Sequence, residues 1–101
     1  MTVTWKPTAL EDRHRLLEAA LLLAIAKPDP HLFAAAVARD ESFQAEGAGL
    51  DGVATFKRGP EPGSYVYTTQ DGHFVLLYSR DSGQVEIERV YPARSNWKST
   101  V

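Results

Sequence analysis

The first half of the chain has the hydrophobic pattern and composition of helices. Strong helix formers run from position 8 to about Ala26, and the apolar positions among them cover well over half of a helix circumference. Thr8 is a suitable N-cap, and Glu11 three positions later completes a capping box, so the sequence predicts a helix that begins there. Two prolines in segment 27–30 end it, because proline lacks an N–H and disfavours the α conformation of its predecessor.

The same break begins a second predicted helix. Asp29 can cap it, and Pro30 fits its first position, where a missing N–H removes no helical bond. Apolar residues between His31 and Ala45 form a stripe opposite polar ones, and the Gly-Ala-Gly sequence at 47–49 ends the helix. The two helices therefore predict an αα-hairpin.

The second half has the aromatic and β-branched composition of strands. Three such runs, 64–69, 73–79 and 84–91, are separated by turn sequences at 70–72 and 80–83 that favour β-hairpins. Thr2–Trp5 is a short β-prone run before the helices, and the glycine-rich segment 47–63 is either a long functional loop or contains a short strand at 52–56. The order predicts one α+β domain, residues 1–101, with an N-terminal strand, a helical hairpin and a three-stranded antiparallel meander.

Composition narrows the class of protein. The 101 residues include no cysteine, which excludes a disulfide framework, a thiol nucleophile and a thiolate metal site. His14 and His31 share no metal-ligand spacing with a carboxylate pair, so we expect neither a metal nor another cofactor. The longest apolar run, 16–26, is shorter than the roughly 20 residues of a membrane span, and no signal peptide is expected. A formal net charge of −2 argues against general nucleic-acid coating. With no cysteine, signal peptide or membrane span expected, the sequence predicts a cytoplasmic domain.

Three segments carry a resemblance to a known family. They are the opening Val3–Asp12, the strand that ends in Val75–Tyr78 and the C-terminal run Val85–Trp97. Together they resemble the RelE/ParE superfamily of toxins from bacterial type II toxin–antitoxin modules, and the first and third segments are closer to the ParE branch. The resemblance implies a helical hairpin on a twisted, mostly antiparallel sheet, an antitoxin that wraps the toxin, and a target that is either DNA gyrase or mRNA on the ribosome.

The resemblance also suggests which residues contact the target. Of the basic and aromatic motif that precedes the C-terminus in the ParE branch, Arg94 and Trp97 are present here. The family's usual basic residue on the first strand of the meander is absent from 64–69. We therefore predict target binding by Arg94 and Trp97 with the nearby cations Lys57, Arg58 and Arg89.

A ribosome-dependent mRNA endonuclease is the alternative activity. Metal-free RNA cleavage needs a base for the 2′-OH and a positive group at the phosphate, and the chain offers Arg94, Tyr91, His73 and Lys57. Glu86 and Glu88 argue against it, because carboxylates that face the cleft would repel RNA. A turn position also explains His73 without chemistry. A toxin fold that poisons nothing and serves only in a complex is the third possibility.

Residues 16–25 give the first helix more apolar surface than one core-facing stripe requires. One explanation is burial on two sides, by the second helix and by the sheet. The other is a surface covered by an antitoxin or a second protomer, through Leu16, Leu22 and Leu23. The assembly would then be a toxin–antitoxin hetero-oligomer or a homodimer.

Overall fold

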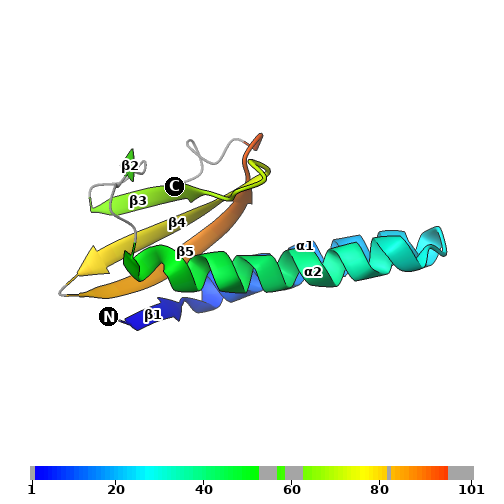
Figure 1. Cartoon of the computed structure of the whole chain (residues 1–101), viewed down its shortest axis with the longest axis horizontal. Coiled ribbons are helices and arrows are strands. Elements are labelled where there is room, and N and C mark those ends of the chain that lie inside the picture. The colour runs from blue at the N-terminus through cyan, green and yellow to red at the C-terminus, as the bar shows by residue number, and fades with distance from the viewer. Residues whose placement is uncertain (1, 53–56, 59–62, 82, 96–101) are drawn as a thin grey trace.

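The computed structural model describes residues 2–52, 57–58, 63–81 and 83–95. Its elements follow the predicted order of strand, two helices and three strands (Figure 1). The helices are α1 (Pro7–Ala26) and α2 (Pro30–Ala48), followed by a 3₁₀ turn at Gly49–Gly52; the strands are β1 (Thr2–Trp5), β2 (Lys57–Arg58), β3 (Ser64–Thr68), β4 (Phe74–Asp81) and β5 (Gln84–Pro92). The α+β class is confirmed.

The five strands form one sheet in the order β1-β5-β4-β3-β2. The pairs from β2 to β5 are antiparallel, whereas β1 lies parallel to β5, with Thr2 opposite Gln84 and Trp5 opposite Ile87. Gly72 and Gly83 adopt positive φ angles of 76° and 80° in the turns before β4 and β5, as the turn chemistry predicts. The predicted strand at 52–56 falls mostly outside the described residues.

The predicted capping box is wrong. Helix α1 begins at Pro7, its N-cap is Lys6, and no side chain caps it. Because proline fits the first helical position, the helix starts one residue earlier than Thr8, whose hydroxyl instead donates to the Glu88 carbonyl oxygen at 2.8 Å. The cap of α2 is confirmed, since the Asp29 side chain accepts from the His31 N–H at 2.9 Å.

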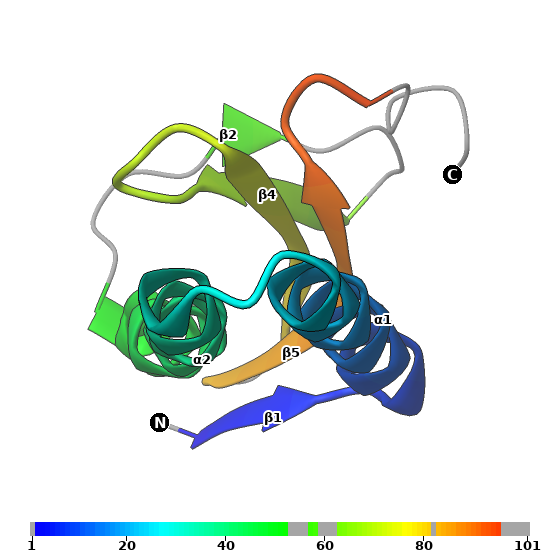
Figure 2. The same ribbon diagram turned by 90° about the vertical axis from the view of Figure 1, so that its right-hand side faces the viewer.

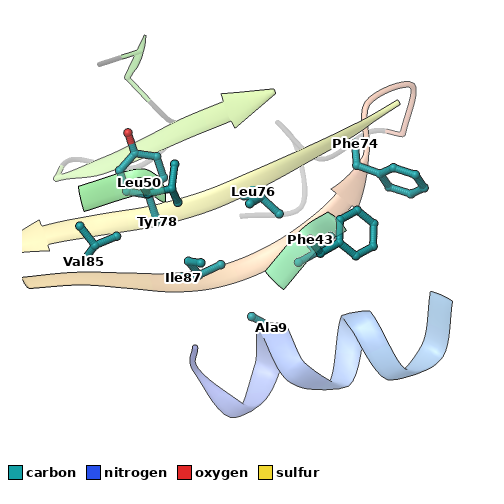
Figure 3. Packing of buried hydrophobic residues seen from close by; sticks show 9 residues of the cluster. Ala9, Phe43, Leu50, Phe74, Leu76, Tyr78, Val85 and Ile87 are labelled. Carbon is teal, nitrogen blue, oxygen red and sulfur yellow. The ribbon is translucent and has the colours of Figure 1, made fainter. Parts of the chain in front are cut away.

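The main core lies between the hairpin and one face of the sheet. Figure 3 shows side chains of β4 and β5 beside Ala9 of α1 and Phe43 of α2. The Phe43 and Phe74 rings meet edge to face, with centroids 5.0 Å apart. A smaller cluster, Val66, Val75 and Leu77, lies on the alternate positions of β3 and β4 and so on the opposite face.

The hairpin extends well past the sheet (Figure 1). Its base is covered by the twisted sheet, which curves around both helices (Figure 2). Arg13 joins the two helices there: its guanidinium contacts both Asp40 carboxylate oxygens at 3.1 Å and lies 4.5 Å from the Trp5 ring. The outer part of the hairpin, near the turn at 27–29, has no sheet against it, which leaves apolar helix positions exposed.

Candidate functional site

Helix α1 is fixed to β5 by one buried carboxylate. Asp12, 5% exposed, accepts two hydrogen bonds from Arg89, at 2.8 and 3.1 Å, and one from the Val90 N–H at 2.9 Å. This side-chain bond to Asp12 raises the pKa of Arg89. Arg89 also lies over the Tyr91 ring at 4.8 Å. Arg89, predicted to bind the target, and Tyr91, a candidate of the alternative ribonuclease site, are therefore part of one cluster on β5.

The β4–β5 end of the sheet holds two further predicted residues. His73 is exposed in the turn before β4, where its N–H donates to Asp71 at 2.9 Å. Its carbonyl oxygen accepts the Ala93 N–H at 2.8 Å, so the His73 turn lies beside the segment that carries the exposed Arg94. The backbone thus brings together His73, Tyr91 and Arg94 at one end of the sheet.

The remaining predicted cations lie elsewhere. Lys57 and Arg58 form β2 at the edge of the sheet, opposite Val66 and Tyr65 of β3, and two strands separate them from β5. Trp97 lies outside the described residues.

The two acidic residues of β5 have a cationic neighbour. Lys6 Nζ lies 3.1 Å from Glu88 and 3.6 Å from Glu86, and the hydrogen bond with Glu88 is the largest cause of the raised pKa of Lys6. Part of the negative charge on this strand is therefore balanced from the residue before α1.

An apolar groove of about 450 Å³ runs between the two helices. Each helix supplies positions i, i+3, i+4 and i+7, which lie on one face. Four alanines line it between larger side chains, and Arg39 lines one end, where it donates to the Leu16 carbonyl oxygen at 2.8 Å. The full lining is Leu16, Ala19, Ala20 and Leu23 from α1, with Leu32, Ala35, Ala36 and Arg39 from α2.

The predicted antitoxin-binding residues divide between two surfaces. Leu16 and Leu23 both line the groove, and Leu16 also packs against the main core. Leu22 lies outside the groove, beside His14, Arg15 and Glu18. Because Leu22 is 59% and Leu23 61% exposed, burial on two sides is the wrong explanation for this pair. The apolar surface extends over both helices, with Ile25 68% and Phe33 51% exposed.

Sequence reasoning missed the two arginines that join the helices, Arg13 and Arg39. No local pattern identified their partners on the other helix, which are the Asp40 carboxylate and the Leu16 carbonyl oxygen. Among the residues that the structure describes, no group of three histidines, aspartates or glutamates could hold a metal ion. Within the same residues, neither helix has the length and apolar character to cross a bilayer.

Comparison by sequence finds no relative, since no protein-family model and no curated protein matches. Comparison by structure does find a similar chain. A chain from a structure described as the chromosomal ParDE TA system from P. aeruginosa superposes with a TM-score of 0.76 at 16% identity, over 93% of this chain and 97% of that one. The backbone arrangement is thus shared along nearly the whole of both chains. The protein therefore has the fold of that ParDE-system chain, as the family resemblance of its sequence implied.

Proposed function

We propose that the chain is the toxin of a type II toxin–antitoxin module, which arrests bacterial growth in the cytoplasm until an antitoxin neutralises it. The observation that carries the proposal is the superposition on a chain of a ParDE system over nearly the full length of both chains. The exposed apolar surface of the hairpin supports the second half of the proposal, because contiguous apolar surface of this kind is typical of a binding site.

A protein target, DNA gyrase in the ParE branch, agrees best with the charges. The Arg89 guanidinium, which could clamp a phosphate, instead meets the carboxylate of Asp12. The neighbouring Glu86 and Glu88 would repel a nucleic-acid backbone, and the whole chain has a net charge of −2. The exposed Arg94 is the basic residue of the C-terminal motif that can make a target contact.

One observation favours the endonuclease instead. The bond between Ala93 and the carbonyl oxygen of His73 places a proton-transfer side chain and the cationic Arg94 on adjoining segments. Such a pair could serve RNA cleavage. Lys57, which was predicted to complete this site, lies on the far edge strand.

Expression of the chain without an antitoxin tests these functions. Growth arrest with a DNA-damage response supports a gyrase toxin, and arrest with rapid mRNA loss supports the endonuclease. Normal growth at a confirmed level of folded protein would contradict a toxin and leave a non-toxic binding module. Co-expression of the protein from the adjoining reading frame should restore growth if that protein is the antitoxin.

A further inference from the structure

The cations near the base of the hairpin differ in whether a carboxylate meets them. Arg13 pairs with Asp40, Arg89 with Asp12, and Lys6 with Glu86 and Glu88. Arg39 has no such partner among the described residues. Its contacts there are one hydrogen bond to the Leu16 carbonyl oxygen and the face of the Phe74 ring, 5.1 Å from the guanidinium carbon.

The missing carboxylate partner matters because Arg39 lines the apolar groove. An arginine has five N–H donors, and the bond to Leu16 uses one of them. The other residues along the groove are leucines and alanines, so a ligand in the groove would exclude water from the guanidinium. A cation that loses water without gaining a carboxylate is costly, whereas an acidic group at this point would form a charge-assisted bond in a low-dielectric setting.

The direction of the groove follows from its lining. Arg39 bonds to Leu16, so these residues mark the end near the sheet. Leu23 and Leu32 are seven positions further out along their helices, which is two helical turns or about 10 Å. The small side chains of Ala19, Ala20, Ala35 and Ala36 between the two ends would let a third helix approach closely.

We propose that the groove selects an amphipathic helix of a protein partner that carries an aspartate or glutamate against Arg39 and an apolar side chain two turns away, against Leu23 and Leu32. Arg39 is then the residue that determines specificity. The inference rests on the proposed function, because it states the chemistry by which the neutralising partner is recognised.

Ala35 allows a test that leaves Arg39 in place. It is exposed, lines the groove and lies four positions before Arg39 on α2. In Ala35→Glu the new carboxylate can pair with Arg39 within the helix, whereas Ala35→Gln adds the same bulk without charge. Arg39→Met removes the cation directly, and Arg15→Met, outside the groove, is the control for loss of one positive charge.

The probe is a helical peptide selected from a displayed random library on the wild-type protein. We expect the selected sequences to be enriched in an acidic residue seven positions from a large apolar one. The affinity of the best peptide, measured by fluorescence anisotropy, should be about tenfold weaker for Ala35→Glu than for Ala35→Gln. It should likewise be about tenfold weaker for Arg39→Met than for Arg15→Met. Replacing the acidic residue of the peptide by its amide should weaken binding to the wild-type protein by the same factor. The same replacement should leave binding to Arg39→Met unchanged.

Three results would overturn the inference: no peptides selected, selected peptides without acidic enrichment, or equal affinity within each matched pair. A discrete wild-type dimer that becomes monomeric in Ala35→Glu would assign the groove to a second copy instead. Peptide binding is measured without reference to growth. A chain that binds acidic helices but does not arrest growth would refute the proposed toxin function and leave the inference about the groove intact. A toxic chain whose groove shows no acidic preference would refute the inference about the groove and leave the toxin function intact.

Discussion

At the scale of single residues, the buried Asp12 carboxylate joins helix α1 to strand β5. We expect Asp12→Ala to lower the free energy of unfolding by about 2–3 kcal/mol, because it leaves the Arg89 guanidinium and the Val90 N–H without their acceptor. Urea denaturation measures the loss. Arg15→Ala is the control: its side chain is 72% exposed and 3.9 Å from the same carboxylate, so its effect should stay within about 0.5 kcal/mol. Equal losses in the two variants would contradict this role for Asp12.

Tyr67 makes the stability of the fold decrease as the pH rises above 10. Burial, together with its hydrogen bond to Glu46, raises the pKa of Tyr67 to about 12 from 10.0. A pKa that is higher in the folded state means that folding favours the protonated phenol, so this stabilisation is complete below pH 10 and is lost between pH 10 and 12. We expect Tyr67→Phe to reduce the fall in melting temperature over that range. A smaller fall should persist, since burial also raises the pKa of Tyr78. Identical pH profiles for wild type and variant would refute the contribution.

Arg94 should separate activity from stability. Because its side chain is exposed, Arg94→Ala should unfold at the wild-type urea concentration and yet relieve growth arrest. Arg15→Ala again removes one exposed cation, on α1, and should leave the arrest unchanged. Full toxicity of a well-expressed Arg94→Ala chain would remove Arg94 from the target site. Addition of a chelator should alter neither growth arrest nor stability.

The contacts of single side chains are the features that the sequence predicted least well. Arg89 was predicted to bind the target, whereas its partner Asp12, which lies 77 positions away, was not foreseen. No local pattern encodes that contact, since it depends on where α1 lies against β5. Arg39 was missed for a similar reason: its partner is a backbone oxygen of the other helix.

At the scale of elements, Gly47 explains how closely α2 approaches the sheet. A Cβ there would lie 2.6 Å from the Trp5 ring and 2.8 Å from Ile87, whereas one at Gly49 would have nothing within 4 Å. We therefore expect Gly47→Ala to destabilise the fold by about 1–2 kcal/mol, despite alanine's better helix propensity. Gly49→Ala should be neutral or stabilise by up to about 1 kcal/mol, since its φ of −81° suits alanine. Thermal unfolding of the two variants compares them, and a stabilised Gly47→Ala would contradict the close packing.

Hydrophobic pattern and turn chemistry predicted most of the elements. The prolines at 28 and 30 separated the helices, and the glycines at 72 and 83 separated the strands, because these residues act on their own backbone. The start of α1 was misplaced because two signals compete there: Pro7 suits the first helical position as well as Thr8 suits a cap. The place of β1 beside β5 was not predicted, since strand composition does not specify which strands pair.

At the scale of the whole molecule, the projecting hairpin carries the exposed apolar surface that we expect a partner to cover. We expect Leu23→Glu to fold normally and to weaken antitoxin binding at least tenfold, because it places a charge in the wall of the apolar groove. Leu22→Glu, equally exposed but outside the groove, should weaken binding less. Affinity measured by calorimetry, with circular dichroism to confirm folding, distinguishes the two sites. Undiminished binding by both variants would mean that this hairpin surface is not the antitoxin site.

The parallel pairing of β1 with β5 has a consequence for the order of events during synthesis. Each residue of β1 pairs with one 82 positions later, so the first strand made waits for the last. At about 5–20 residues per second, that interval is roughly 4 to 16 s. During it the helical hairpin can form from local contacts, but β1 has no strand to pair with because β5 has not been made. Such non-local closure slows folding, and completion must follow emergence of the C-terminal strand from the ribosome. A nascent chain stalled before Gln84 should therefore remain protease-sensitive at its N-terminus.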